Sequence, residues 1–213
     1  MLFTEAVEAS VLGLLKSLQS KHYLKGFCLA GGTALALYNG HRKSVDIDLF
    51  SDFAFDSAQM MENIVQDFQF NLMFSAPNTL KGAIDGINVD ILAHRYKLIG
   101  DIVDEEGFLI LSEPDITAMK LNAISTSGQR IKDFIDIYYL LEKYPLKDML
   151  GWYSEKYNQT NDLLILKSLV YFDDVEISEW PVMIREPGLK WKDVRHRIEK
   201  TVLNYSRRGT GIR

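Results

Sequence analysis

The chain has little cysteine, little proline and no long apolar run. Its 213 residues include one cysteine, Cys28, and five prolines. A single cysteine excludes an intramolecular disulfide and a cysteine-based zinc site, and the apolar neighbours of Cys28 predict a buried structural thiol. No apolar run approaches the roughly 18 residues that a membrane span needs, and residues 1–20 lack the basic start of a signal peptide. We therefore expect a cytoplasmic protein without a membrane partner.

Charge is moderate in amount but unevenly distributed along the chain. The apolar share of 47% and the charged share of 25% are typical of a soluble globular protein. The segment 190–213 holds eight Lys or Arg against Asp193 and Glu199, a net charge of +6 in a chain whose total is −5. A basic tail on an acidic body can dock on a polyanion such as RNA. The alternative is a solvated terminal helix with a frayed end.

The first half of the chain reads as mixed α/β. Helical spacing of apolar residues predicts helices at 5–20, 33–38 and 57–68, the last capped by Asp56 or Ser57. Strand-like runs predict strands at 24–30, 44–50, 70–75, 81–84 and 87–93, and a short strand or an extended connection at 108–111. The dipeptide Asp85-Gly86 predicts a two-residue hairpin turn.

The second half of the chain reads as helical. Ser112, followed by Pro114 and Asp115, is a helix start signal. We expect helices at 112–126, 129–143, 146–157, 162–171 and 190–205, with a proline-containing loop at 179–188. These patterns predict an α/β unit at 1–111 and a helical unit at 112–213.

Three aspartates sit between hydrophobic residues on predicted strands. Asp46 and Asp48 are two apart and so share one face, while Val45 and its alternate neighbours should point into the core. Asp90 has the same setting after the hairpin, and would join the first two if its strand lies alongside. Clustered carboxylates repel one another unless a cation or proton intervenes, and hard oxygen ligands suit Mg²⁺ or Mn²⁺. The alternative is a solvent-facing decoration of an edge strand.

A glycine pair precedes the first aspartates. Gly31 and Gly32 let a backbone approach an anion, and Thr33 can cap the helix that follows. Helix N-termini bind phosphate through free amides and the helix dipole. Alone, the tripeptide is a weak signal, because paired glycines also make tight turns.

The helical half carries a second set of charged residues. Asp133 and Asp136 lie on a helix that is apolar on two faces, so they should be partly buried and need basic partners. Lys120 and Arg130 are the candidates. Two interpretations stay open: a structural salt-bridge network between two helices, or a lysine that contacts a triphosphate or stabilises transition-state charge.

Taken in order, these motifs resemble the nucleotidyltransferase AbiEii/AbiGii toxin family of the DNA polymerase β-like superfamily. The quoted residues are Gly31-Gly32-Thr33, the Asp46-x-Asp48 pair, Asp90, the set Asp115, Lys120 and Arg130, and the run Lys132-Asp133-x-x-Asp136. Thr33 stands where serine is frequent, and Lys132 stands where the family has arginine. Lysine cannot form a bidentate fork, so a contact that depends on that arginine is not carried over.

The resemblance implies an α+β fold, with a palm-like mixed β-sheet, flanking helices and a helical C-terminal half. It implies an NTP substrate, Mg²⁺ or Mn²⁺, and nucleotidyl transfer, in some members to the tRNA 3′ end, by a toxin linked to phage abortive infection and restrained by a separately encoded antitoxin protein. The residue roles that follow are catalytic Asp46, Asp48, Asp90 and Lys120; metal-binding Asp46, Asp48 and Asp90; and nucleotide-binding Gly31, Gly32, Thr33, Lys120, Arg130, Asp133 and Asp136.

The acceptor stays open at this stage. A C-terminal helix carrying Lys192, Arg195 and Arg197 could bind an RNA backbone. The acidic body favours a protein or small-molecule acceptor instead. A third hypothesis is a non-catalytic NTP-binding module that acts through a protein partner.

Overall fold

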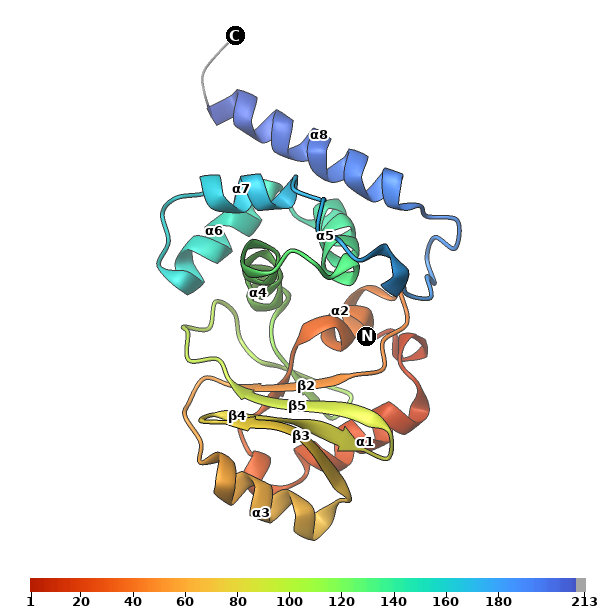
Figure 1. The fold of residues 1–213 in the computed structure, drawn as a ribbon, viewed down its shortest axis with the longest axis vertical. Helices are drawn as coiled ribbons and strands as arrows, with labels where there is room; N and C mark the ends of the chain where they lie inside the picture. The colour runs from red at the N-terminus through yellow and green to blue at the C-terminus, as the bar shows by residue number, and fades with distance from the viewer. Residues whose placement is uncertain (210–213) are drawn as a thin grey trace.

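The computed structural model describes residues 1–209 of the chain. These residues form one mixed sheet and eight α-helices (Figure 1). The strands are β1 (Cys28–Leu29), β2 (Ile47–Ser51), β3 (Phe70–Ala76), β4 (Thr79–Ile84), β5 (Ile87–Ala93), β6 (Val103–Glu105) and β7 (Phe108–Ile110). The helices are α1 (Ala9–Gln19), α2 (Gly31–Asn39), α3 (Ser57–Asp67), α4 (Glu113–Thr126), α5 (Ile131–Lys143), α6 (Leu146–Tyr157), α7 (Leu163–Leu169) and α8 (Trp191–Gly209). The predicted α+β fold class is confirmed.

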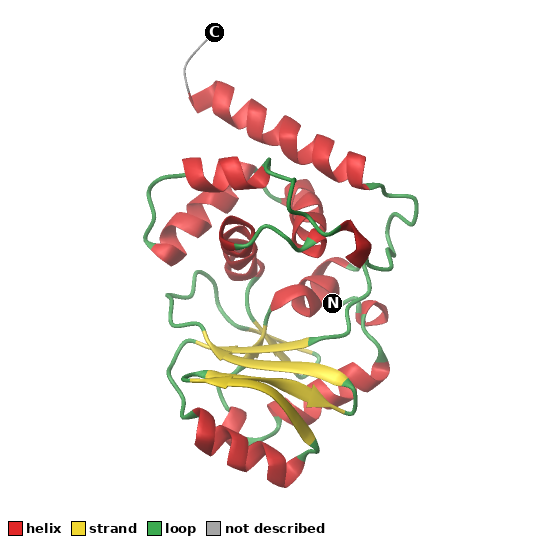
Figure 2. Ribbon diagram, viewed as in Figure 1, coloured by secondary structure: helices red, strands yellow, loops and turns green. Residues whose placement is uncertain are grey.

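The sheet places the second and fifth strands side by side at its centre. The strand order is β3-β4-β5-β2-β1-β7-β6, with β2 parallel to β5 and antiparallel to β1. Figure 2 shows the strands as a layer with helices above and below it. The predicted hairpin between β4 and β5 is confirmed: Asp85 and Gly86 have φ of +50° and +80°, as a type I′ turn requires. The hairpin returns the chain so that β5 can lie against β2.

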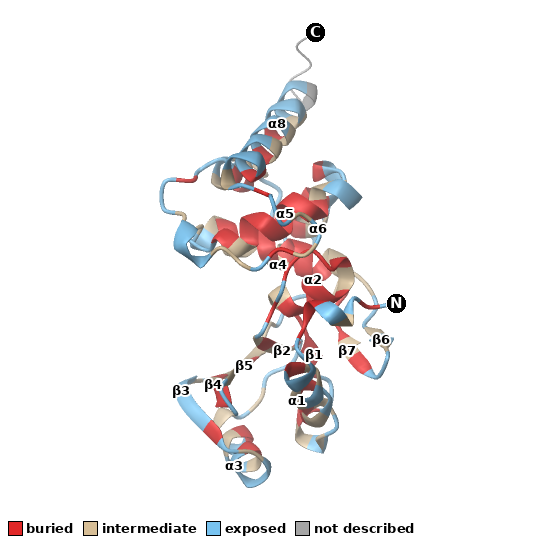
Figure 3. Cartoon of the chain, turned by 90° about the vertical axis from the view of Figure 1, so that its right-hand side faces the viewer, coloured by how far each residue is buried: buried red, intermediate tan, exposed pale blue. Residues whose placement is uncertain are grey.

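Helices cover both faces of the sheet. In Figure 1, α1 and α3 lie below the sheet, whereas α2 lies above it and contacts α4 and α5. Helix α2 consists mainly of buried Ala and Leu side chains, so it can be surrounded on all sides. Figure 3 shows buried segments running from the central strands through α2 into α4 and α5, and the buried hydrophobic residues form one cluster that includes both halves of the chain.

Strong local signals gave accurate element bounds. Strand β5 and helix α6 have the predicted ends, and α3 and α4 begin after the predicted caps: Asp56 accepts from the amides of Ala58 and Gln59, and Ser112 Oγ accepts from the Asp115 amide. Helix α2 runs from Gly31 to Asn39, two residues earlier and one residue later than the predicted 33–38, and Gly40 follows it in the left-handed region at φ +59°.

Several predicted elements differ from the structure. The expected first helix is interrupted: a short 3-10 turn, Thr4–Ala6, precedes α1. Strand β1 has only two residues, and β6 was not predicted. Strand β2 begins at Ile47, so Val45 lies before it and is half exposed; the prediction that Val45 points into the core was wrong. The proposed boundary at residue 111 stays a prediction.

Within residues 1–209, none of the helices combines the length and apolar character that crossing a bilayer would need. The thiol of Cys28 is free and buried, as predicted. The end of the predicted basic tail, residues 210–213, lies outside the described residues.

Candidate active site

A polar cleft of about 360 Å³ lies between the start of α2 and the segment 179–182. Its lining includes three of the predicted motifs: the glycine turn, the aspartates before and in β2, and basic residues at the start of α5. The lining residues are Gly32, Thr33, Arg42, Lys43, Ser44, Val45, Asp46, Asp48, Arg130, Lys132, Glu179, Trp180, Pro181 and Val182. We refer to this feature as the cleft.

The side chains that pack against Gly31 and Gly32 leave no room for a Cβ atom at either position. Gly31 has φ of +67°, a backbone conformation that favours glycine. A Cβ on Gly31 would collide with the carboxylate of Asp48, and one on Gly32 would collide with the guanidinium of Arg42. The glycine pair therefore brings the backbone at the start of α2 close to both a carboxylate and a cation.

Thr33 has a structural role that the sequence did not indicate. Its side chain is buried, and its hydroxyl donates to the carbonyl of Asp46 and lies 2.8 Å from the hydroxyl of Ser44. Thr33 is the third residue of α2 and does not cap it; the cap position is Ala30, without a side-chain bond. The hydroxyl thus fixes the segment before β2 against α2.

Asp48 and Asp90 lie directly opposite each other. They are register partners on the parallel strands β2 and β5, so the strand adjacency on which the sequence argument depended is present. Burial raises the pKa of Asp48 to about 6, and repulsion from Asp90 adds to the effect, whereas Lys120 and Arg130 oppose it. At neutral pH a carboxyl group with this pKa is mostly ionised, and a bound cation would neutralise its charge.

Neighbouring residues hold the other two predicted metal ligands. Asp46 Oδ1 accepts a hydrogen bond of 3.0 Å from Asn88, and Asp90 Oδ2 accepts one of 2.6 Å from Lys81. In residues 1–209, no group of three His, Cys, Asp or Glu side chains is arranged to hold a metal ion. The donor chemistry nevertheless fits a divalent cation, because Asp48 and Asp90 are hard oxygen donors that repel each other.

A buried ion network lies beneath the cleft. Arg42 binds Asp136 through Nε (2.7 Å) and Nη2 (3.0 Å), and His41 Nε2 lies 2.8 Å from the same carboxylate. Lys120 Nζ lies 2.6 Å from Asp133 and 2.8 Å from Asp136. All five side chains are buried. The predicted need of Asp133 and Asp136 for basic partners is met by Lys120, but Arg42 and His41 take the place expected for Arg130.

The network keeps the Asp136 carboxylate ionised. Burial alone would raise the pKa of Asp136, but Arg42, Lys120 and His41 overcome it and hold that pKa well below its usual range. Burial would likewise lower the pKa of Lys120, but Asp133 and Asp136 raise it above its usual value. Burial lowers the pKa of His41 despite the opposing effect of Asp136, so at neutral pH His41 donates as an uncharged imidazole.

Lys120 does not line the cleft. Its ammonium is buried against Asp133 and Asp136, which is the arrangement of a structural salt-bridge network. A contact between Lys120 and a nucleotide stays a prediction. Arg130, in contrast, is exposed and lines the cleft beside Lys132.

Asp115 is an internal anchor. Its carboxylate accepts from Lys156 (2.7 Å), from Ser112 Oγ (2.6 Å) and from the amides of Ile99 and Gly100. Both Asp115 and Lys156 are buried. This ion pair connects α4 to α6 and to the chain that leaves β5.

The basic residues Lys192, Arg195 and Arg197 of α8 do not line the cleft. Helix α8 crosses the helical half on the side away from the sheet (Figure 1). Arg197 binds Glu142 at 2.7 Å and covers the ring of Tyr138, and Arg195 lies over the ring of Phe172. Lys192 is exposed.

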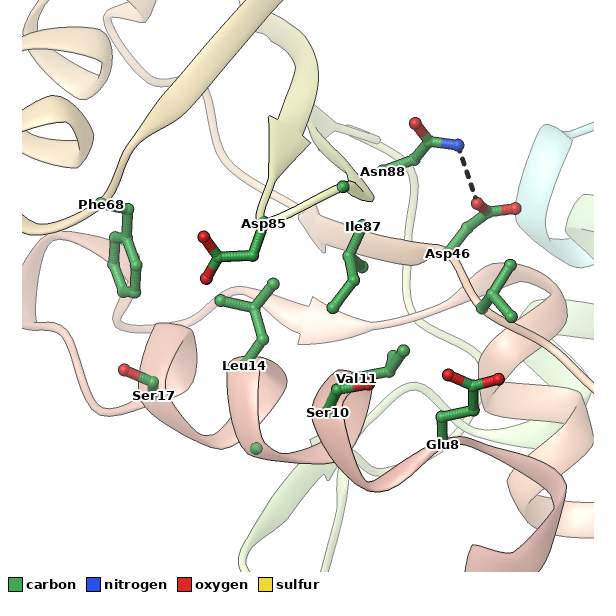
Figure 4. A pocket seen from close by; sticks show the side chains of 13 residues that line it. Glu8, Ser10, Val11, Leu14, Ser17, Asp46, Phe68, Asp85, Ile87 and Asn88 are labelled. Atoms are coloured by element: carbon green, nitrogen blue, oxygen red, sulfur yellow. Dashed lines mark hydrogen bonds between the residues drawn. The ribbon is translucent and has the colours of Figure 1, made fainter.

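A second groove, of about 590 Å³, lies on the other side of Asp46 (Figure 4). It runs between α1 and the β4–β5 turn and shares Val45 and Asp46 with the cleft. Its charged lining residues are all acidic: Glu8, Asp46 and Asp85. We refer to it as the α1 groove.

The residues that sequence analysis missed are Arg42, Lys81 and the segment 179–182. Lys81 could have been found from the hairpin, because a two-residue turn at Asp85-Gly86 pairs position 81 with position 90. No local signal connects Arg42 with Asp136, which lies 94 residues further along the chain.

Comparisons with solved structures place the fold among nucleotidyltransferases. The nucleotidyltransferase toxin MenT4 of Mycobacterium tuberculosis H37Rv matches with a TM-score of 0.52 and 14% identity, over 92% of this chain and 84% of that one. JHP933 of Helicobacter pylori matches with a TM-score of 0.54 and 15% identity, over 95% and 94%. At these identities the likeness establishes the fold, and the protein has a nucleotidyltransferase fold.

Comparisons of sequence identify the family. Residues 13–81 match the family model described as nucleotidyl transferase AbiEii toxin, Type IV TA system. An uncharacterized protein of Aquifex aeolicus (strain VF5), aq_aa25, is 32% identical over 185 residues, which cover 84% of this chain and 87% of that protein. The chain belongs to the AbiEii nucleotidyl transferase toxin family, and it is a transferase.

Proposed function

We propose that this protein transfers a nucleotidyl group from an NTP to an acceptor hydroxyl, in a reaction that depends on Mg²⁺ or Mn²⁺. The observation that carries the proposal is the composition of the cleft. A glycine turn, two aspartates and exposed cations line one cavity, and Asp90 lies opposite Asp48 on the neighbouring strand. Nucleotidyl transfer needs anion binding, carboxylates for a divalent cation and positive charge near the phosphates.

Each part of the cleft has a proposed role. The backbone at Gly31, Gly32 and Thr33 would approach the triphosphate, and Arg130, with Lys132 beside it, would neutralise phosphate charge. Asp46, Asp48 and Asp90 would hold the cation, which when bound supplies charge neutralisation on the phosphates and activation of the attacking hydroxyl.

Asp90 is the proposed general base, which would take the proton of the attacking hydroxyl. Its Oδ2 is the atom that Lys81 contacts. Lys120 would support the reaction through the network and through its field at Asp48, where it lowers the pKa. The proposed nucleotide-binding roles of Asp133 and Asp136 would be indirect, through Lys120 and Arg42.

RNA, with the tRNA 3′ end as the attacking group, is the proposed acceptor. The family resemblance supports it, as does the exposed basic residue Lys192 on α8. Because no α8 residue that the structure describes lines the cleft, the acceptor would have to be large enough to contact both. The proposal includes a separately encoded antitoxin, a role in phage defence and a cytoplasmic location.

A second candidate function is transfer to a cationic protein segment or small molecule. The α1 groove favours it, because this groove adjoins the cleft at Asp46 and has no basic residue in its lining. A polyanion entering there would meet three carboxylates, whereas a cation would be attracted to them. Replacement of Glu8 and Asp85 with neutral residues should impair this reaction and leave transfer to RNA unchanged.

The test is nucleotide transfer with a matched control. The purified protein is incubated with Mg²⁺, total RNA and each of four α-³²P-labelled NTPs, beside an Asp48→Asn variant and a control variant, Asp52→Asn, at an exposed position after β2. Label in RNA from the wild-type and control proteins, but not from Asp48→Asn, supports the proposal. Label in protein or small molecules supports the second candidate. Tight NTP binding without any transfer would indicate a non-catalytic binding module.

A further inference from the structure

One wall of the cleft is supplied by a segment far along the chain. Residues 176–184, here called the strap, leave α7 and cross to the segment that follows α2. The Glu176 amide donates to the Gln129 carbonyl (2.9 Å) at one end. At the other, the Lys43 amide donates to the Val182 carbonyl (2.8 Å) and the Ile184 amide to the His41 carbonyl (2.9 Å). The strap is therefore fixed at both ends.

Trp180 lies between these anchors and lines the cleft. Pro181 follows it, and a residue before proline is restricted to extended backbone; Trp180 accordingly has φ −59° and ψ 124°. Trp180 is partly exposed, and the rest of it packs against the hydrophobic core. Its position is thus set by the backbone while part of its surface is accessible from the cleft.

The other two tryptophans have ring partners. Trp152 lies edge-on to Tyr144 at 4.9 Å, and Trp191 packs against Phe134 and Phe172 at 5.8 and 5.4 Å. Trp180 forms no aromatic pair with any ring in residues 1–209. Its neighbours in the cleft lining, Pro181 and Val182, are apolar, and Val182 is 69% exposed.

The cleft therefore has three chemically different parts. An apolar surface lies at 180–182. Carboxylates lie at Asp46, Asp48 and Glu179, and cations at Arg42, Lys43, Arg130 and Lys132. A nucleoside triphosphate has three matching parts: a cation-bound region, a charged phosphate chain and a flat base. Only the base has a surface suited to an indole, because every nucleobase presents a π-face.

We propose that Trp180 is the surface on which the base of the NTP stacks, with Pro181 and Val182 completing that side of the site. This inference rests on the proposed function and adds the residue that recognises the base. An aromatic platform is tolerant of base identity, so the strap would supply affinity for nucleosides in general, and a preference among the four bases would come from other contacts.

The variants separate stacking from simple hydrophobic filling. Trp180→Phe keeps an aromatic face, whereas Trp180→Leu keeps apolar volume and removes the face. Both should unfold at temperatures close to that of the wild-type protein. Binding of a non-hydrolysable NTP with Mg²⁺, and of inorganic triphosphate with Mg²⁺, is measured by calorimetry for all three proteins.

We expect the wild-type protein to bind the NTP more tightly than triphosphate. Trp180→Leu should weaken NTP binding between about 5-fold and 150-fold and leave triphosphate binding unchanged, while Trp180→Phe should retain most NTP affinity. Equal NTP affinity in the wild type and Trp180→Leu would overturn the role of Trp180 and leave the proposed function intact. A wild-type protein that binds neither ligand would overturn both.

Discussion

Asp48 of β2 and Asp90 of β5 are register partners on adjacent parallel strands, and their mutual repulsion contributes to the raised pKa of Asp48. Two carboxylates in this relationship destabilise the fold unless a positive charge lies near them. Lys81 provides one such charge at Asp90, whereas the partly buried carboxylate of Asp48 has no hydrogen-bond or ion-pair partner within residues 1–209. The repulsion between Asp48 and Asp90 should therefore affect both the stability of the protein and its affinity for a cation.

Asp48→Asn should stabilise the protein in the absence of metal. The folded-state pKa of about 6 lies above the ordinary value of 3.8, so the folded state holds a proton that the unfolded chain loses between pH 4 and 6. The contribution of Asp48 to the free energy of unfolding therefore falls as the pH rises from about 4 to 6. The free energy of unfolding of Asp48→Asn should exceed that of the wild type by on the order of 2 kcal/mol at pH 7, and the difference should vanish near pH 4.

Urea unfolding at several pH values checks this expectation, with Asp52→Asn as the control. Asp52 is exposed, and its replacement should change stability by less than about 0.5 kcal/mol. A variant at position 48 that is less stable than the wild type at pH 7 would contradict the raised pKa. Added Mg²⁺ should raise the melting temperature of the wild type and not that of Asp48→Asn.

Lys81→Met should increase the affinity for Mg²⁺. The Lys81 ammonium lies 2.6 Å from Asp90 Oδ2, so it competes with a cation for that oxygen. Because the pair is partly exposed, we expect a gain of roughly fivefold, equivalent to ~1 kcal/mol. Calorimetric titration with Mg²⁺ measures it. Lys97→Met, which removes an exposed lysine paired with Glu155, is the control, and a weaker affinity in Lys81→Met would show that the lysine supports the site.

Lys120→Met should destabilise the protein strongly. Removing Lys120 leaves Asp133 without its described ion-pair partner in a buried site, and breaking a buried ion pair costs about 3–5 kcal/mol. Lys132→Met, which removes a partly exposed lysine 3.7 Å from Glu179, should cost less than about 1 kcal/mol. Thermal unfolding decides whether Lys120 has a structural role or contacts the nucleotide. A Lys120→Met variant with normal stability but no nucleotide transfer would show that Lys120 contacts the nucleotide.

Gly31→Ala should disrupt the site, whereas Gly151→Ala should not. A methyl group at Gly31 meets the Asp48 carboxylate and a backbone with positive φ, which costs on the order of 1–3 kcal/mol. Gly151 lies within α6 with open space around it, so alanine there should stabilise by about 0.5–1 kcal/mol. Unfolding curves of the two variants should shift in opposite directions, and a neutral Gly31→Ala would show that the turn is not constrained.

Sequence signals predicted secondary structure best where the residues that determine an element all lie in one short segment. The Asp85-Gly86 turn and the apolar runs beside it specify β4 and β5, and the cap at Ser112 specifies the start of α4. Strand β6, in contrast, has three residues and exists through its pairing with β7. A strand this short has no alternating pattern of hydrophobic residues in the sequence from which it could be predicted.

The features of the candidate site likewise divide into those that local sequence predicts and those that depend on the folded structure. The placement of Asp48 and Asp90 on strands was predictable because both lie between hydrophobic residues, whereas their pairing depended on whether the two strands lie side by side. The fork of Arg42 on Asp136 was not, because α2 meets α5 only in the folded chain. Trp180 was likewise unpredictable, since its segment reads as a loop and gains its place through hydrogen bonds to residues 41–43.

The position of the strap in the chain sets the order in which the site can be completed during synthesis. Residues 1–111 contain the whole sheet, the glycine turn and all three aspartates, and N-terminal segments leave the ribosome first. The wall formed by residues 176–184 emerges later, after helices α4 to α7. A nascent or truncated chain that stops before it carries the carboxylates of a nucleotidyltransferase in a cleft that lacks one side.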